Sequence, residues 1–366
     1  MTAGQAREKV LQAVRKLCEE GLIERTWGNI SIRVSETHFL ITPSGLAYET
    51  MRPEQLVLVS IADCSYQGSI KPSSEKGIHA DAYRLRPDVN FVIHTHQYWA
   101  SIAGIAGVAL TGFSHPQLGK RVPCAAYGLP GTKTLRKAVA AEIAAWPDCK
   151  AFFLRSHGAL CLGRDMEDAF ASARALEEVC EARVMDQEEA REPVPVPRKL
   201  GSSGRAGDSF VLGEGTESRR YPLNHAALPP AAALHAAVYK AGNFQYIAQE
   251  TSPEVLAVCA EKRPLRPYLD DLAQIAGADI RCVPPDPKRV RDAMRGRNAV
   301  LIEGMGALCA GKSKEDLEAV CALLRKGCAA RLYANAVPNC RPLGVLDARL
   351  QRLMYTQSYE RKKVQC

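Results

Sequence analysis

Short apolar runs and longer stretches with helical spacing follow one another along the chain. Two apolar runs, at 90–93 and 151–154, predict buried strands. Residues 7–17 place apolar side chains at helical intervals among charged ones, and residues 78–83 also have a helix-like pattern. The pattern therefore predicts both helices and strands, and it draws attention to the polar residues where the two apolar runs end.

Three histidines stand at those ends. His94 and His96 follow the first run, and His157 follows the second. Alternate side chains of a strand share a face, so His94 and His96 can point at one ion, and a neighbouring strand could bring His157 to the same place. Three imidazoles leave a coordination position open, as in catalytic zinc sites. Polar histidines at a strand end are the simpler interpretation of the pair.

Further motifs precede the histidines. They are Gly-Asn-Ile-Ser-Ile-Arg at 28–33, Ile-Thr-Pro-Ser-Gly at 41–45 and Pro-Ser-Ser-Glu at 72–75, followed by the helix-like 78–83. In this order and at these distances, the motifs and histidines resemble the class II aldolase/adducin family over roughly residues 5–190. The resemblance implies an α/β fold, in which a central, mainly antiparallel sheet is flanked by helices. It also implies rings of subunits with active sites between them.

The resemblance assigns roles to individual residues. It implies that His94, His96 and His157 hold one zinc ion per chain, and that Glu75 lies at the metal and exchanges protons with the substrate. It also implies a cradle for a substrate phosphate, in which hydroxyls, an amide and exposed backbone N–H groups donate to the anion. The phosphate-binding residues would be Asn29, Ser44, Gly45, Ser73 and Ser74.

Simpler interpretations of these residues stand beside the functional ones. Residues 28–29 and 43–45 have the composition of turns. Ser73 or Ser74 would cap the following helix, whose positive end Glu75 would favour. His79, four residues further along that helix, is expected to be a packed or hydrogen-bonded residue and not a ligand.

The function implied by the resemblance is a zinc-dependent aldolase that cleaves a ketose 1-phosphate, such as L-fuculose 1-phosphate, to dihydroxyacetone phosphate and an aldehyde. In the family's fuculose-phosphate aldolases, a tyrosine from a neighbouring subunit donates a proton to the aldehyde half. The comparable segment here, 111–117, has no tyrosine, and His115 could take its place. The aldehyde half of the substrate therefore stays open.

Other functions on the same scaffold also stay open. Sugar-acid phosphate decarboxylases and a thioribulose-phosphate dehydratase use the same histidines, whereas 4-epimerases typically carry Asp where Glu75 stands. An adducin-like scaffold without enzymatic activity belongs to a different class. Such domains lack the metal residues that this chain retains in its first half.

An internal repeat divides the chain. Residues 156–163 are echoed at 304–311, and 78–83 at 234–239. Matching the Asn-Phe pairs at 90–91 and 243–244 places Ile247 at the position of His94 and Gln249 at that of His96. Met305 then replaces His157 and Ala231 replaces Glu75. We therefore expect the second copy to be a packing or regulatory module without a metal site.

The 366-residue length also favours more than one domain. The expected division is a catalytic domain at 1–190, a Pro/Gly/Ser-rich linker at 191–221, a degenerate aldolase-like domain at 222–340 and a tail at 341–366. Because the second copy can occupy a neighbour's place in a ring, we expect a homo-oligomer, specifically a dimer of two-domain chains.

Composition narrows the partners and the compartment. Hydrophobic residues make up 46% and charged residues 24%, and no apolar run is long enough for a membrane span. The net charge of +8 is spread along the chain without a dense basic block, which favours a small anionic sugar phosphate over nucleic acid. Thirteen cysteines without a Cys-x-x-Cys pair or a signal peptide predict reduced thiols in the cytoplasm.

Overall fold

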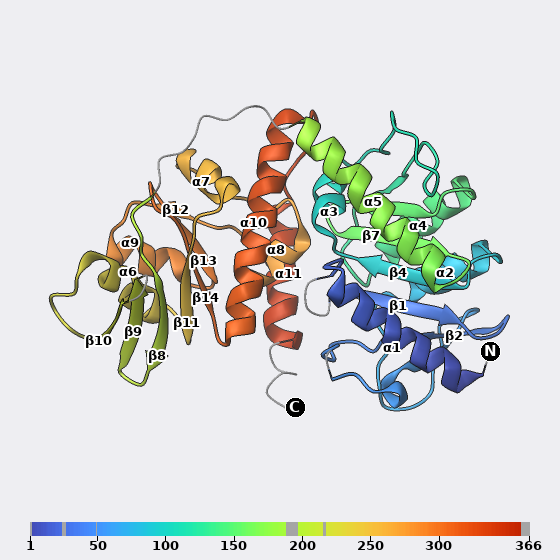
Figure 1. Cartoon of the computed structure of the whole chain (residues 1–366), viewed down its shortest axis with the longest axis horizontal. Coiled ribbons are helices and arrows are strands. Elements are labelled where there is room, and N and C mark those ends of the chain that lie inside the picture. Colours follow the sequence, from blue (N-terminus) through green and yellow to red (C-terminus); the bar gives the residue numbers. More distant parts are fainter. Residues whose placement is uncertain (1, 24–26, 49, 188–196, 215–216, 360–366) are drawn as a thin grey trace. The chain divides into compact units, whose positions relative to one another are not determined.

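The chain folds into two compact units. The computed structural model describes residues 2–23, 27–48, 50–187, 197–214 and 217–359 (Figure 1). The first unit comprises Met1–Gln187 with Val337–Cys340, and the second comprises Glu188–Ala336 with Arg341–Cys366. No helix among the described residues combines the length and the hydropathy that crossing a bilayer requires.

The first unit is built around a seven-stranded sheet in the order β3-β2-β1-β4-β7-β6-β5. Neighbouring strands are antiparallel except for the parallel pair β5 and β6. The strands are β1 (Gly28–Arg33), β2 (His38–Ile41), β3 (Val57–Ser60), β4 (Phe91–Thr95), β5 (Cys124–Ala125), β6 (Ala151–Leu154) and β7 (Gly158–Gly163). The helices are α1 (Ala3–Glu19), α2 (Lys76–Leu85), α3 (Tyr98–Gly104), α4 (Lys133–Ala145) and α5 (Met166–Asp186), with the short 3-10 helix η1 (Pro53–Gln55).

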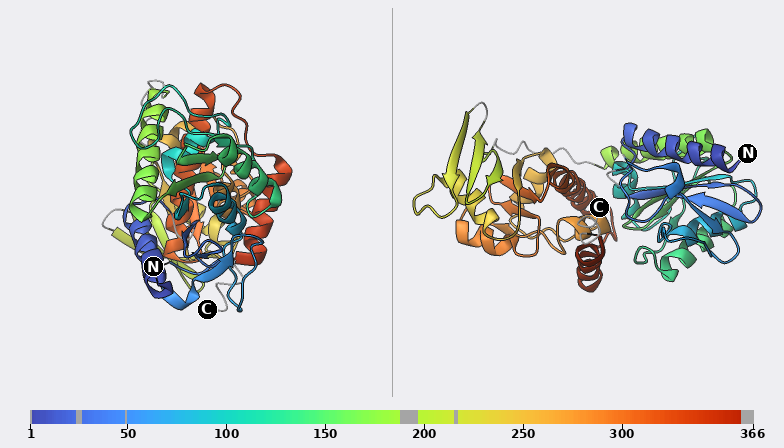
Figure 2. Two further views of the ribbon diagram at one scale, coloured as in Figure 1. Left: turned by 90° about the vertical axis from the view of Figure 1, so that its right-hand side faces the viewer. Right: turned by 90° about the horizontal axis from the view of Figure 1, so that it is seen from below.

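Helices cover both faces of this sheet. Figures 1 and 2 show α1 and α5 along one face, where ion pairs join them, and α2 with α4 on the other. Val92, Phe152 and Leu160 point from the sheet into the core under α2 and α4. His94 comes two residues after Val92 on β4 and therefore points to the same face. The apolar layer that supports the sheet thus ends at this histidine.

The second unit repeats this architecture. Its sheet has the order β10-β9-β8-β11-β14-β13-β12, again with one parallel pair at the far edge. The strands are β8 (Ser202–Ala206), β9 (Ser209–Glu214), β10 (Glu217–Pro222), β11 (Tyr246–Glu250), β12 (Cys282–Val283), β13 (Ala299–Ile302) and β14 (Gly306–Gly311). The helices are α6 (Pro230–Tyr239), α7 (Pro253–Ala260), α8 (Asp270–Ile275), α9 (Pro287–Met294), α10 (Lys314–Ala336) and α11 (Val345–Met354), followed by the π-helical turn η2 (Tyr355–Tyr359).

The two copies differ in the two connections on either side of the third strand of each unit, β3 and β10. Residues 42–56 join β2 to β3, whereas residues 215–216 alone join β9 to β10. Similarly, residues 61–75 join β3 to α2, but only 223–229 join β10 to α6. Both units therefore have the same strands, and these two connections are shorter in the second unit.

The expected linker and tail differ from the structure. Strands β8, β9 and β10 lie within the stretch 191–221 or at its end, and α11 lies within the expected tail. β8 and the mostly exposed edge strand β10 are rich in serine, glycine and arginine, so they lack the apolar alternation that identifies a strand. The proline segment that begins the expected linker lies, up to residue 196, outside the described residues.

Each unit also contains a buried Ser-His-Tyr group under its sheet. In the first unit, Ser31 Oγ lies 2.6 Å from His79 Nδ1 and 2.7 Å from the Tyr83 hydroxyl. In the second, Ser203 Oγ lies 2.7 Å from His235 Nδ1 and 2.9 Å from the Tyr239 hydroxyl. Both histidines are fully buried. The prediction that His79 is a hydrogen-bonded structural residue is confirmed.

The buried His235 makes the protein sensitive to acid. Burial lowers the pKa of His235 from 6.5 to about 4. The unfolded chain therefore binds this proton first, so the stability that a neutral His235 provides is complete above pH 6.5 and is lost as the pH falls toward 4. Between pH 7 and pH 4.5, we expect the free energy of unfolding to fall by about 2 kcal/mol more in the wild type than in His235→Gln. Urea titrations at both pH values measure this difference, and equal pH dependence of the two proteins would contradict it.

Candidate active site

Three buried histidines converge in the first unit. His94 ends the buried part of β4, His96 follows that strand, and His157 lies in the turn between β6 and β7. One ring nitrogen from each lies within 4.8 Å of the others. The sequence correctly grouped these residues, although β7 and not β6 is the neighbour of β4.

The turn that carries His157 has little freedom. Ser156 adopts a left-handed φ of 60°, where the second unit has Gly304 with a φ of 71°. A serine in this conformation costs on the order of 1 kcal/mol, which a glycine avoids. A side chain at Gly158 would come within 2.2 Å of the Thr95 carbonyl oxygen and 3.2 Å of the His94 ring. The turn therefore presses directly against the strand end that carries the other histidines.

The environment of His94 suits a metal ligand. Its Nδ1 lies 2.9 Å from the Ala159 carbonyl, which can only accept, so Nδ1 carries the proton and donates it. This leaves the Nε2 lone pair directed at the other histidines. Burial, more than any nearby charge, lowers the pKa of His94 to about 3 and keeps the ring neutral. A neutral ring with a free Nε2 is the form that binds a divalent ion.

Glu75 completes the group of four side chains. It is the N-cap residue of α2 and makes no side-chain capping bond, so the expectation that Ser73 or Ser74 caps this helix was wrong; the Glu75 N–H donates to Ser73 Oγ at 3.2 Å. Its side chain is 7% exposed. Oε1 lies 2.9 Å from His157 Nε2, and Oε2 lies 3.3 Å from His94 Nε2.

The electrostatics of Glu75 follow from these contacts. Burial by itself raises the pKa of the carboxyl, but His94, His157 and the hydrogen bonds that it accepts outweigh burial and hold the pKa well below its usual range. Glu75 is therefore an ionised carboxylate facing three imidazoles. A divalent cation among them would balance its charge, and the donor set fits zinc.

The expected phosphate-binding residues lie on three adjoining segments. Pro43 and Pro72 form an antiparallel bridge, and Ser44 N–H donates to the Lys71 carbonyl at 2.9 Å. This pairing brings the 44–45 loop, in which Gly45 has a φ of 75°, beside Ser73 and Ser74. The structure thus gathers the motifs at 41–45 and 72–75 next to Glu75.

Asn29 is not in a turn but in strand β1, and its amide is already engaged. Nδ2 donates to Glu75 Oε2 at 2.9 Å, and Oδ1 lies 2.5 Å from His79 Nε2. Register places Asn29 directly opposite His94 on β4. Sequence reasoning missed the contacts of Asn29 with Glu75 and His79, because nothing in local spacing reveals a bond between residues so far apart in the chain.

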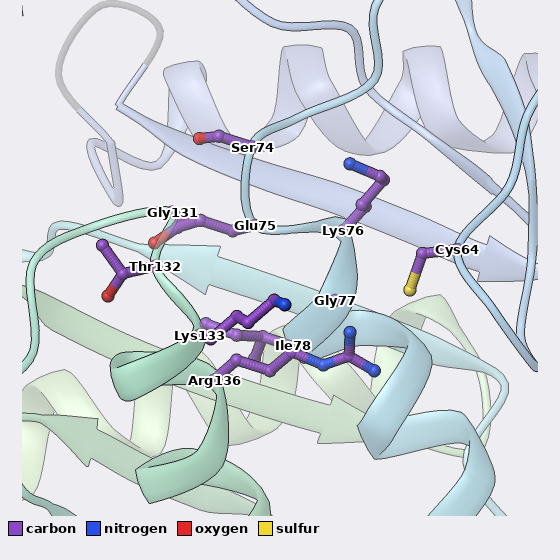
Figure 3. A pocket seen from close by; sticks show the side chains of 10 residues that line it. All are labelled: Cys64, Ser74, Glu75, Lys76, Gly77, Ile78, Gly131, Thr132, Lys133 and Arg136. Atoms are coloured by element: carbon purple, nitrogen blue, oxygen red, sulfur yellow. The ribbon is translucent and has the colours of Figure 1, made fainter.

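A small pocket opens beside Glu75 where α2 and α4 begin (Figure 3). Ser74 and Glu75 line it together with three cationic side chains and neighbouring backbone. Arg136 in this pocket is held by Asp81, with both guanidinium contacts at 2.7 Å. Of the five expected phosphate-binding residues, Ser74 alone is among those that line it. The cationic residues are Lys76, Lys133 and Arg136.

Within the part of the chain that the structure describes, His115 makes no hydrogen bond or ring contact with the histidine cluster. It lies in the 111–117 loop, where its Nδ1 accepts from the Gln117 N–H at 3.1 Å. The Gln117 side chain in turn donates to Asp168 on α5. The loop is therefore fixed to α5, and the proposal that His115 replaces the family tyrosine stays a prediction.

The second unit lacks the corresponding groups, but the expected register was wrong. Gln249 on β11 pairs with Leu308 as His94 on β4 pairs with Leu160. Gln249, and not Ile247, therefore occupies the position of His94. The similar Asn-Phe pairs at 90–91 and 243–244 caused the error, because they do not occupy equivalent places in the two sheets.

The remaining positions follow from the same register. Thr251 stands where the first unit has His96, so the assignment of Gln249 to that position was also wrong. Met305 precedes β14 as His157 precedes β7, and Ala231 lies four residues before His235 as Glu75 lies before His79. Among the described residues, the only cluster of potential metal ligands is the histidine trio of the first unit.

Comparison with known families agrees with this duplicated architecture. A family model described as Class II Aldolase and Adducin N-terminal domain matches residues 8–184 and again residues 208–332. The chain belongs to this family, and the second match confirms the repeat.

Individual relatives match about half of the chain. A 5-deoxy-D-ribulose 1-phosphate aldolase of Bacillus thuringiensis serovar kurstaki is 33% identical over 180 residues, which are 48% of this chain and 83% of that protein. A 5-methylthioribulose-1-phosphate/5-deoxyribulose-1-phosphate aldolase of Rhodospirillum rubrum is 33% identical over 178 residues, covering 48% and 78%. A solved L-fuculose 1-phosphate aldolase has 27% identity and a TM-score of 0.48, covering 53% of this chain and 92% of that one.

The histidine cluster predicts a defined metal content. We expect the purified protein to bind one divalent ion per chain, and His94→Ala, His96→Ala or His157→Ala to lose it, because each removes one of three ligands. His38→Ala, which changes a histidine outside the cluster, is the control. Elemental analysis after dialysis measures the content. Two ions per chain, or none after incubation with excess zinc, would contradict the assignment.

Proposed function

We propose that the first unit is a zinc-dependent aldolase that cleaves a ketose 1-phosphate to dihydroxyacetone phosphate and an aldehyde. The observation that carries the proposal is the buried Glu75 carboxylate in contact with His94 and His157 of the three-histidine cluster. The names of two relatives favour 5-deoxyribulose 1-phosphate or 5-methylthioribulose 1-phosphate as substrates, and L-fuculose 1-phosphate is a further candidate.

The chemistry follows from the groups present. When bound by His94, His96 and His157, a zinc ion supplies Lewis-acid polarisation of the substrate's carbonyl and adjacent hydroxyl oxygens. Glu75 is placed to move a proton to and from the carbon next to the carbonyl, which needs a proton after the carbon–carbon bond breaks. Its burial keeps water away from the carboxylate.

Substrate positioning is assigned to the loops around Glu75. In this proposal, Ser44, Gly45, Ser73 and Ser74 donate hydrogen bonds to the phosphate, together with the Nδ2 hydrogen of Asn29 that Glu75 does not use. Support comes from the antiparallel bridge that brings the two loops together beside Glu75. Fixing the phosphate there would set the distance from the reacting carbons to the carboxylate.

The second unit has a structural role in this proposal. It keeps the sheet and the Ser-His-Tyr group but has no counterpart of the carboxylate, the three ligands or the 42–56 connection.

The cysteines bear on the compartment. All of the described cysteines are free thiols, which supports a reducing compartment such as the cytoplasm.

A screen of ketose 1-phosphates tests the reaction. We expect release of dihydroxyacetone phosphate from at least one of 5-deoxyribulose, 5-methylthioribulose and L-fuculose 1-phosphate, measured by coupled reduction with NADH. The His94→Ala variant is the negative control. Loss of carbon dioxide from a sugar-acid phosphate, or of water from 5-methylthioribulose 1-phosphate, would instead indicate a decarboxylase or a dehydratase.

Replacing Glu75 tests its role with the best of these substrates. Glu75→Gln keeps the shape of the side chain but removes its proton affinity, so kcat should fall on the order of a hundredfold or more while most of the metal is retained. Glu167→Gln on the exposed face of α5 is the matched control. Unchanged turnover in Glu75→Gln would show that another group transfers the proton.

We also propose a homo-oligomer, specifically a dimer, because a covalently attached second copy can replace a neighbouring subunit. Light scattering should give a particle of twice the 39.9 kDa chain mass. A particle of one chain with full activity would overturn this proposal and leave the catalytic one intact.

A further inference from the structure

Five side chains form one continuous chain of hydrogen bonds that ends on the carboxylate. Tyr83 contacts Ser31 at 2.7 Å, and Ser31 contacts His79 Nδ1 at 2.6 Å. His79 Nε2 contacts Asn29 Oδ1 at 2.5 Å, and Asn29 Nδ2 contacts Glu75 Oε2 at 2.9 Å. All five residues are buried, and none is more than 7% exposed.

Chemistry fixes the direction of every bond in this chain. An ionised carboxylate can only accept, so Asn29 presents its NH₂ to Glu75 and its oxygen to His79. His79 must then donate through Nε2. Burial lowers the pKa of His79 to about 3, so the ring is neutral and its Nδ1 accepts from Ser31. Ser31 in turn accepts from the Tyr83 hydroxyl.

The second unit determines the same histidine tautomer independently. His235 Nε2 lies 2.9 Å from the Leu200 carbonyl, which can only accept, so this nitrogen also carries the proton. Ser203 therefore donates to His235 Nδ1, as Ser31 does to His79. The position of Asn29 is taken by Gly201, which lies opposite Gln249 as Asn29 lies opposite His94.

The comparison separates two roles of the group. The Tyr-Ser-His part occurs in both units, so packing under the sheet accounts for it. The link from the histidine through an amide to a carboxylate occurs only in the first unit, where Asn29 joins His79 to Glu75. In the second unit, the His235 Nε2–H donates to the Leu200 backbone carbonyl and orients no further side chain.

We propose that His79 is a positioning residue for the reaction: its Nε2–H fixes the orientation of the Asn29 amide, which holds Glu75 Oε2 and leaves Oε1 facing His157. This inference rests on the proposed role of Glu75. Without a donor at Nε2, the Asn29 amide can rotate, and its oxygen would then repel the carboxylate that its NH₂ now holds.

Two substitutions distinguish the donor from the bulk of the ring. The amide nitrogen of a glutamine at 79 can reach about where Nε2 lies, whereas an asparagine reaches only about as far as Nδ1. We expect His79→Gln to keep kcat within about threefold of the wild type. We expect His79→Asn to lower kcat at least tenfold, with KM changed by less than threefold and one metal ion per chain retained.

The second unit supplies matched controls. His235→Gln and His235→Asn make the same changes in the same hydrogen-bond group, without a carboxylate at its end. They should destabilise the protein about as much as the changes at His79, measured by thermal unfolding, but leave kcat unchanged. Equal losses of kcat in His79→Gln and His79→Asn, or no loss in either, would overturn the proposal.

A measurement without turnover keeps the test independent of the proposed function. In ¹⁵N-histidine NMR spectra of the wild type, the signals of His79 and His235, identified by their loss in the Gln variants, should both show a proton on Nε2. A proton on Nδ1 of His79 would overturn the proposal even if the protein is an aldolase. If no ketose phosphate is cleaved but both tautomers are as expected, the proposed function fails and the geometry stands.

A second substitution, Ser31→Ala, tests the proposal if His79→Asn does not fold. Ser31→Ala removes the donor to Nδ1, so the His79 ring can adopt either tautomer. We then expect a mixture of the two tautomers in the NMR spectrum and a severalfold lower kcat, with Ser203→Ala as the control. A mixture of the two tautomers with unchanged kcat in Ser31→Ala would overturn the proposal.

Discussion

An ionised carboxylate buried beside three imidazoles is unstable unless other groups compensate for its charge, and the architecture of the first unit provides that compensation. Taking such a charge out of water costs several kcal/mol when it is unpaired. Glu75 meets this cost with its contacts to His157 after β6 and to the Asn29 amide on β1. These contacts fix the beginning of α2 against the sheet, and the placement of the loops that precede α2 follows from it.

The second unit shows the same fold without that constraint. Once Ala231 stands in place of the carboxylate, nothing requires cations or amides nearby, and Gln249, Thr251, Met305 and Gly201 fill the corresponding positions. The sheet order and the buried serine, histidine and tyrosine are nevertheless unchanged. The same fold therefore forms without the site residues, and the left-handed Ser156, where the second unit has Gly304, belongs to the unit that has the histidine cluster.

Much of this arrangement could be predicted from the sequence, because its strongest signals are local or repeated. The apolar runs ending at His94 and His157, the helix at Lys76–Leu85 and the repeated glycine-rich strand at 304–311 all identify themselves. The polar strands β8 and β10 do not, since they carry few apolar residues. The wrong assignment of Ile247 to the position of His94 came from matching the Asn-Phe pairs at 90–91 and 243–244. The correct register is revealed only by the strand pairing. The Asn29–Glu75 bond joins residues that are far apart in sequence and could not be inferred from spacing.

The shortened connections also bear on how the second copy came to be inactive. A site lost by point substitutions alone can be restored by reversing them, and Gln249, Thr251 and Met305 are each one substitution away from histidine. Restoring all three would rebuild a place for an ion. It would not supply the loop to which we assign the substrate phosphate, because residues 215–216 alone stand where the first unit has residues 42–56, and they leave no positions for Ser44 and Gly45. The difference in loop length, more than the differences at single positions, therefore separates the second unit from the proposed active site.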